Sequence, residues 1–211
     1  MADLTKLFDA VVDGDAKTTL EMTKQALAEN IKPEEIVSRY MIPAMDEVGR
    51  RFEAEEYFVP ELLLAGRAMK GALEILRPLL AASGAKPAGK VVIGTVKGDL
   101  HDIGKNLVAA MLEGAGFEVT DLGTDVSPEK FVEAVNTKDA QIVCLSALLT
   151  VTMPAMKSTV EALTSAGVRD KVKVMIGGAP VTDQYAREIG ADSYSENASA
   201  AVAAARTLVA A

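Results

Sequence analysis

From residue 89 onward the chain alternates short apolar runs with stretches of helical periodicity, and this alternation restricts the fold more than any other feature. The apolar runs lie at residues 90–95, 117–122, 141–148, 172–176 and 192–194. The helical stretches lie at residues 103–115, 127–137, 154–166, 181–189 and 197–210. Buried strands separated by helices are typical of a parallel sheet that is covered on both faces. We therefore predict an α/β domain over residues 90–211 with a five-stranded, flavodoxin-like (Rossmann-like) parallel sheet.

Residues 1–82 show only helical periodicity. Apolar residues recur at helical spacing in four stretches, marked by Leu4, Phe8 and Val11; by Leu20, Met22, Ala26 and Leu27; by Ile36, Tyr40, Met45 and Val48; and by Leu62, Leu63, Met69, Leu73 and Leu76. Pro33 followed by two glutamates is a favoured helix opening. Four helices with short connections predict a four-helix bundle as an N-terminal domain over residues 1–85. The segment Ser83–Gly89 breaks the pattern and predicts a linker.

The composition excludes several classes of partner. The 211 residues are 49% hydrophobic and 25% charged, with a net charge of -8 and no basic run, so neither nucleic acid nor an anionic membrane surface is an expected partner. The charge-free stretch 141–156 is too short to span a membrane. The first residues lack the basic and apolar regions of a signal peptide, so we expect a cytoplasmic location. The single cysteine, Cys144, lies in an apolar run and is predicted to be an inert buried side chain.

The single histidine, His101, directly follows the first predicted strand and lies two residues after Asp99. This placement suits a metal ligand whose second ring nitrogen is held by a carboxylate. One imidazole cannot form an all-protein zinc site. The alternative is that His101 is a surface residue without chemistry.

Polar and small residues follow four of the predicted strands. In an open parallel sheet, ligands bind beyond the carboxyl ends of the strands, where the strand order reverses. The residues at these ends are His101, Ser146–Leu148, Gly177–Ala179 and Tyr194–Ala198. Each alone is compatible with an ordinary turn, and their common placement at one edge of the sheet favours a binding site.

Three of these motifs occur together at defined spacing. The chain reads Asp99-x-His101-x-x-Gly104, then after 41 residues Ser146-x-Leu148, then after 28 residues Gly177-Gly178. This arrangement resembles the signature of base-off, histidine-on cobalamin-binding domains, as in cobalamin-dependent methionine synthase. Residues 41–52 followed by 57–61 resemble the helical cap that precedes those domains. Nearly the whole chain is similar to the stand-alone corrinoid proteins of methyltransferase systems.

The resemblance implies cobalamin as the cofactor and His101 as the metal ligand, in the lower axial position on cobalt. Asp99 would accept the proton of the other imidazole nitrogen, and Thr152 would complete this relay where the family usually has serine. The displaced nucleotide tail would enter the gap between the first and third strands. The residues assigned to cofactor binding are Gly98, Asp99, Leu100, His101, Asp102, Ile103, Gly104, Ser146, Leu148, Thr150, Gly177, Gly178, Ala179, Tyr194, Asn197 and Ala198.

The resemblance also gives the helical bundle a role as a cap over the upper face of the cofactor. Phe52, Val59 and Met45 would shield the bound methyl group from water, although a place in the bundle core is the simpler interpretation of Met45. The cap must move aside for partner enzymes, and the linker Ser83–Gly89 would be the hinge.

The function implied is that of a non-catalytic methyl carrier, because the chemistry belongs to the cofactor. Cob(I)alamin would accept a methyl group from a substrate methyltransferase, and methylcob(III)alamin would deliver it to a second one, with tetrahydrofolate or coenzyme M as final acceptor. The implied partners are a substrate-specific methyltransferase, a corrinoid-to-acceptor methyltransferase and a reductive activation protein; methylcobalamin, cob(I)alamin and cob(II)alamin are the expected cofactor states.

Three alternatives stay open at this point. A cobalamin-dependent sensor has a similar bundle and binding domain but normally carries a further DNA-binding module. An adenosylcobalamin mutase subunit shares the histidine motif without the bundle. A plain flavodoxin-like or receiver domain explains the sheet and leaves the spaced motifs unexplained. The sequence does not identify the methyl donor.

Overall fold

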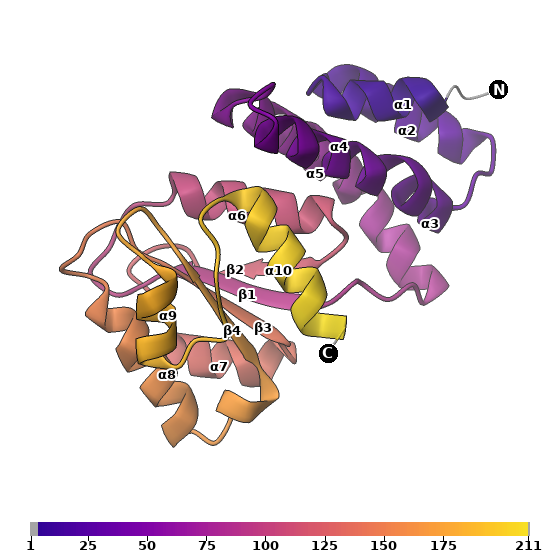
Figure 1. Cartoon of the computed structure of the whole chain (residues 1–211). Coiled ribbons are helices and arrows are strands. Elements are labelled where there is room, and N and C mark those ends of the chain that lie inside the picture. Colours follow the sequence, from indigo (N-terminus) through magenta and orange to yellow (C-terminus); the bar gives the residue numbers. More distant parts are fainter. Residues whose placement is uncertain (1–3, 211) are drawn as a thin grey trace. The chain divides into compact units, whose positions relative to one another are not determined.

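A computed structural model describes residues 4–210 of the chain (Figure 1). The chain folds into two compact units, which we describe separately. One contains the residues up to Pro87 together with Ala110–Gly116, and the other contains Ala88–Ala109 and the residues from Phe117 onward. The break after Pro87 lies inside the predicted linker. No sequence pattern indicated that Ala110–Gly116 would join the first unit.

Within residues 4–87, the first unit contains four helical segments. Their elements are α1 (Leu4–Val12), α2 (Ala16–Ala28), the continuous run α3 (Pro33–Ile36), η1 (Val37–Met41) and α4 (Ile42–Glu53), and α5 (Val59–Ser83). The sequence predicted an ordinary third helix, whereas the structure contains a π-helical turn in its middle, with Ile42 N–H donating to the Val37 carbonyl. Pro43 follows directly and has no N–H to donate, so the regular hydrogen-bond ladder cannot continue through it.

The buried face of α2 differs from the predicted one. Leu20 and Met22 are only partly buried, and the fully buried side chains include Thr19 and Thr23. Both threonine hydroxyls donate to a carbonyl one turn earlier in the chain, Thr19 to Asp15 at 2.8 Å and Thr23 to Thr19 at 2.7 Å. Because these hydroxyls are satisfied locally, small polar residues can occupy the interior of the bundle.

The second unit contains the predicted parallel sheet. Its strands are β1 (Lys90–Thr95), β2 (Glu118–Asp121), β3 (Ile142–Ser146), β4 (Lys173–Gly177) and β5 (Ser193–Tyr194). Its helices are α7 (Pro128–Lys138), α8 (Pro154–Ser165), η2 (Arg169–Lys171), α9 (Asp183–Ile189), α10 (Ala198–Ala210) and the part of α6 (Ile103–Gly114) that precedes Ala110. All strand pairs are parallel, in the order β2-β1-β3-β4-β5. This confirms the flavodoxin-like α/β fold and places the reversal of strand order between β1 and β3.

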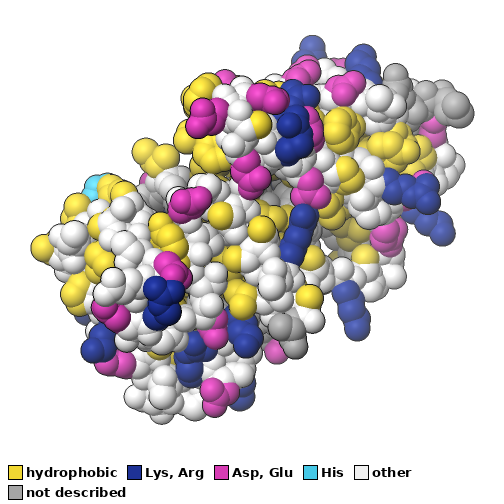
Figure 2. Space-filling model, viewed as in Figure 1, with side chains coloured by type: hydrophobic (Ala, Val, Ile, Leu, Met, Phe, Trp, Pro, Cys, Tyr) yellow, Lys and Arg dark blue, Asp and Glu magenta, His cyan; other side chains and the backbone are white. Residues whose placement is uncertain are grey.

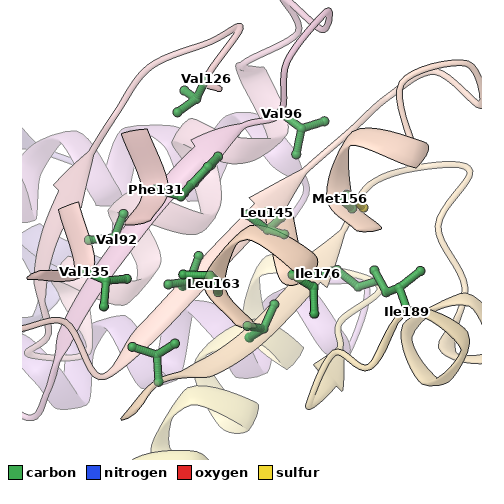
Figure 3. Packing of buried hydrophobic residues seen from close by; sticks show 14 of the residues in the cluster. Val92, Val96, Val126, Phe131, Val135, Leu145, Met156, Leu163, Ile176 and Ile189 are labelled. Carbon is green, nitrogen blue, oxygen red and sulfur yellow. The ribbon is translucent and has the colours of Figure 1, made fainter. Parts of the chain in front are cut away.

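The sheet is covered by helices on both faces (Figure 1). On the face covered by α7, α8 and α9, the central strands contribute valines such as Val92 and Val143, which pack against Phe131, Met156 and Leu163 (Figure 3). This core fixes the three strands whose ends carry the motifs. Cys144 is buried in β3, and burial raises the pKa of its thiol to about 12, as expected for an inert side chain. No helix within residues 4–210 is long and apolar enough to cross a membrane.

Gly94 in β1 permits close approach of the α7 helix. A Cβ atom at this position would lie 2.8 Å from Cζ of Phe131 and 3.1 Å from a methyl carbon of Val126. Phe131 is fully buried and cannot move without disturbing the core. Glycine therefore lets α7 contact the strand whose end carries His101.

We predict that Gly94→Ala destabilises the protein by about 1–3 kcal/mol through overpacking. Gly104→Ala is the matched control, because a Cβ at Gly104 meets nothing within 4 Å and the position is helical. That change should leave the free energy of unfolding unchanged or raise it by up to about 1 kcal/mol. Urea unfolding followed by circular dichroism measures both, and equal losses of stability in the two variants would contradict the packing argument.

Candidate functional site

The candidate site lies at the carboxyl ends of β1 and β3, where the strand order reverses. The loop after β1 turns at Gly98, whose φ of 85° favours glycine. Gly98 N–H donates to Oδ1 of Asp125 at 2.8 Å, and Asp125 N–H donates to the Asp99 carbonyl at 2.9 Å. The loop that follows β2 thus holds the segment that leads into the histidine.

The Asp99 carboxylate is the centre of the site. It is 0% exposed and accepts hydrogen bonds on both oxygens. Oδ1 accepts from the backbone N–H of His101 at 3.0 Å and faces the Nδ1 atom of its ring at 2.7 Å. Oδ2 accepts from the Thr152 hydroxyl at 2.7 Å and from the backbone N–H groups of Leu148 at 2.8 Å and Leu149 at 3.3 Å. One carboxylate therefore connects the loops after β1 and β3.

These contacts decide the charge of Asp99. Burial alone would raise its pKa, but the hydrogen bonds from Thr152, from the backbone N–H groups of His101 and Leu148 and from the His101 ring outweigh burial and hold the pKa well below its usual value. The carboxylate is therefore ionised at neutral pH. An ionised acceptor at 2.7 Å favours the tautomer with the proton on Nδ1 of His101.

That tautomer leaves the Nε2 lone pair of His101 available. The side chain is 51% exposed, and within residues 4–210 the Nε2 atom has no hydrogen-bond partner. The structure thus forms the Asp99, His101 and Thr152 arrangement that the sequence predicted, with threonine supplying the hydroxyl. No group of three His, Cys, Asp or Glu side chains able to hold a metal occurs in the described part of the chain.

Small residues shape the neighbouring strand ends. Gly178 has a φ of 136°, and a Cβ there would lie 1.9 Å from the Ala147 carbonyl oxygen, so no other residue fits. A Cβ at Gly177 would approach the Ser195 carbonyl oxygen to 3.1 Å. Among residues 4–210, the buried Ser195 Oγ atom has no hydrogen-bond partner, and no atom lies within 4 Å of a Cβ placed on Gly104. An unsatisfied buried hydroxyl and open space beside glycine fit a ligand that approaches the backbone.

Apolar side chains surround the histidine at the surface. Leu100 is 73% exposed, Ile103 71% and Val151 80%, and Leu148 and Leu149 are also exposed. Figure 2 shows the histidine at the surface with hydrophobic side chains next to it. An exposed apolar group of this size is typical of a binding surface. The sequence analysis identified three of its members and missed Leu149 and Val151, which lie in the turn after β3 and carry no motif.

The structure places the other predicted cofactor residues at the same strand ends, in different environments. Ser146 and Tyr194 are partly buried, Ala198 is buried, and Thr150 and Ala179 are exposed. The Asn197 side chain has a structural task, because its Oδ1 accepts from the backbone N–H of Ala200 at the start of α10. Asp102 is exposed, and its Oδ2 accepts from the Asn106 side chain.

The three residues predicted to shield the methyl group are distributed unevenly in the helical unit. Met45 is buried in the core, where a Cβ on Gly114 would lie 2.7 Å from its Cγ atom. Phe52 is partly buried and Val59 is exposed. Phe58, which the sequence analysis did not select, is more exposed than Val59, and its N–H donates to Glu61 at 2.9 Å. The shielding role of all three stays a prediction.

Comparison with known families decides the affiliation of the chain. A family described as "B12 binding domain" matches residues 89–203, and a second family of the same description matches residues 4–77. The chain belongs to the B12-binding domain family. Its cofactor is therefore cobalamin, and the open Nε2 of His101, the orphaned Ser195 hydroxyl and the glycine-lined strand ends fit that group.

Relatives of this B12-binding protein include corrinoid proteins of similar length. It is 44% identical over 209 residues to the dimethylamine corrinoid protein of Methanosarcina barkeri, covering 98% of this chain and 97% of the relative. It is 43% identical over 208 residues to trimethylamine corrinoid protein 1 of Methanosarcina acetivorans, covering 98% and 96%. The crystal structure of the methanol:cobalamin methyltransferase complex of Methanosarcina barkeri contains a similar chain, with a TM-score of 0.87, 29% identity and coverage of 98% and 79%.

We predict that Asp99→Asn destabilises the B12-binding protein by about 2–3 kcal/mol at neutral pH, because the amide nitrogen must face groups that donate hydrogen bonds. The folded-state pKa of Asp99 lies below its ordinary value of 3.8, so its ionisation stabilises the fold above that pH and this contribution is lost as the pH falls. The stability difference between wild type and variant should therefore shrink below pH 3.8. Urea unfolding across pH 3–7 measures it, and a pH-independent difference would contradict the assignment.

Proposed function

We propose that this protein is a corrinoid methyl carrier in which Nε2 of His101 would hold the cobalt. The observation that carries the proposal is the hydrogen-bonded series from Thr152 through Asp99 to His101, which leaves Nε2 as an oriented ligand. Cobalamin supplies the methyl-accepting and methyl-donating chemistry when it is bound. The chain binds and orients the cofactor and holds the proton on Nδ1.

Asp99 and Thr152 control how readily His101 binds and leaves the metal. A carboxylate that accepts the Nδ1 proton makes Nε2 a stronger ligand. The same carboxylate lies 2.7 Å from Nδ1 and would keep the proton on that atom, so that Nε2 would be the atom that holds the metal. The exposed position of the ring gives it room to move.

The apolar side chains around His101 and the glycines at the strand ends form the proposed cofactor surface. Leu100, Ile103 and Leu148 would contact the corrin ring, while Gly177, Gly178 and Ser195 would line the path of the nucleotide tail. We further propose that residues 1–85 act as a cap domain. Phe52, Val59 and the neighbouring exposed Phe58 would exclude water from the methyl group.

Methyltransferases are the proposed partners, since the cofactor would carry the methyl group and a separate enzyme would activate the methyl donor. Similarity to proteins named for dimethylamine and trimethylamine supports a methylated amine as the donor. A similar chain occurs in a methanol:cobalamin methyltransferase complex, which supports a separate enzyme as the donor-side partner. A second methyltransferase, acting on tetrahydrofolate or coenzyme M, and a reductive activation protein would complete the system in the cytoplasm.

Electron paramagnetic resonance of the Co(II) form tests the ligand assignment. Because His101 is the single histidine, labelling with ring-15N histidine should change the nitrogen superhyperfine splitting from that of 14N to that of 15N. His101→Ala should abolish this change while leaving weakened cofactor binding through the strand ends. If the superhyperfine splitting after labelling is still that of the 14N atom of benzimidazole, the assignment is refuted.

Reconstitution tests the carrier role. Loaded with reduced cobalamin, the chain alone should demethylate no methylamine, and addition of a dimethylamine or trimethylamine methyltransferase should give about one methyl group per chain. A methanol methyltransferase is the comparison enzyme and should give less. Absorption spectra and product amine report the stoichiometry. Rapid turnover by the isolated chain would overturn the carrier assignment, and preferential methylation from methanol would overturn the amine assignment.

A further inference from the structure

The first turn of α6 contains a buried lysine that has no part in the site described above. The Lys105 side chain is 1% exposed, and its Nζ donates to Oδ2 of Asp121 at 2.6 Å and to Oδ1 of Asn106 at 2.6 Å. Removing an ammonium group from water is costly unless its hydrogen bonds are replaced. Lys105 is therefore held by an ion pair to the end of β2 and by a neighbouring amide.

Through Asn106, the contacts of Lys105 extend to Asp102, the residue directly after His101. The Asn106 side chain that accepts from Lys105 donates through Nδ2 to the Asp102 carboxylate at 3.0 Å. Asn106 also donates its backbone N–H to the Asp102 carbonyl at 2.7 Å. The orientation of the Asn106 amide is thus fixed by an acceptor and a donor at once, and it links Lys105 to the start of the helix.

Through Asp121, the contacts of Lys105 extend to the backbone of His101. The second carboxylate oxygen of Asp121 accepts from Gly123 N–H at 2.9 Å, and the Gly123 carbonyl accepts from Thr95 N–H at 3.0 Å. The Thr95 hydroxyl then donates to the His101 carbonyl at 2.9 Å. The His101 carbonyl is therefore connected through Thr95 and Gly123 to Asp121. The start of α6 is connected to the same Asp121 through Asn106 and Lys105.

We propose that Lys105 is a positioning residue for His101. Its ammonium joins the start of α6 to the loop after β2 and so fixes the backbone from which the imidazole projects toward Asp99. The consequence for cobalt ligation rests on the proposed function, whereas the effect on the loop and the ring exists without cofactor. The charge does not act on the metal directly, because Lys105 binds Asp121 and Asn106.

The test uses three variants of the full chain. Lys105→Met removes the ammonium with little change in side-chain volume, and Asp121 is 41% exposed and can be solvated. Asn106→Ala removes the hydrogen bond to Asp102 at an exposed position and leaves no buried charge unpaired. If Lys105→Met does not fold, this variant tests whether the Lys105 contacts position His101. Lys97→Met is the control, since it removes the same charge from an exposed position in the histidine loop.

Amide hydrogen exchange and ring-15N spectra of the cofactor-free protein are the readouts. Lys105→Met should speed exchange at the His101 and Asn106 amides on the order of tenfold relative to the Val143 amide in β3, because the opening is local. The ring-nitrogen shifts of the single histidine should move away from those of the Nδ1–H tautomer and toward those of the Nε2–H tautomer, because the Nδ1–Asp99 contact would be held less firmly. Asn106→Ala should act in the same direction, and Lys97→Met should change neither.

The outcomes separate this inference from the proposed function. Two results for Lys105→Met would overturn the inference: uniformly faster exchange across the sheet, or unchanged His101 signals. Either would show that Lys105 stabilises the fold without positioning the histidine. If only Asn106→Ala folds, unchanged His101 signals in that variant overturn the inference. In the cobalamin-loaded Co(II) protein, Lys105→Met should lower the fraction of histidine-ligated cobalt. Absence of histidine ligation already in wild type would reject the proposed function, and the cofactor-free readouts would still decide the role of Lys105.

Discussion

The buried Asp99 carboxylate is the interaction on which the rest of the site depends. A carboxylate without access to water must find donors for both oxygens, and here the loops after β1 and β3 supply them. The same contacts lower its pKa and order the turn that ends at Thr152. Charge, loop geometry and histidine tautomer are consequences of one buried group, so a change at Asp99 alters all three together.

The topology explains why that group can be assembled from distant parts of the sequence. Asp99 and Leu148 are 49 positions apart, yet β1 and β3 are neighbours in register, with Thr95 beside Ser146. Parallel strands end at the same edge, so the loops that follow adjacent strands must meet. The alternation of apolar runs and helices predicts this edge. The spacing of the motifs then indicates which residues meet there.

Local patterns predicted the elements well and the polar connections poorly. The strand ends follow from periodicity, the pairing of His101 with Asp99 follows from their spacing, and Thr152 follows from the resemblance to cobalamin-binding domains. The exposed Leu149 and Val151 and the bracing Asp125 lie in turns whose geometry is set by contacts with other loops. The burial of Thr19 and Thr23 in α2 was not predicted for a related reason. Hydropathy treats threonine as polar and takes no account of a hydroxyl that donates to a carbonyl of its own helix.

Lys105 is a charged residue whose burial could likewise not be predicted from local sequence. In sequence it lies just after the motif and looks like a solvent-exposed cation, because lysine is rarely buried. Its burial depends on Asp121, sixteen residues later, and on the orientation of one amide. Ionic and backbone contacts therefore hold the backbone around the histidine, while the imidazole itself is half exposed. Under the proposed function, this combination would let the imidazole leave the metal and return to the same geometry, because its backbone and its Asp99 partner would stay in place.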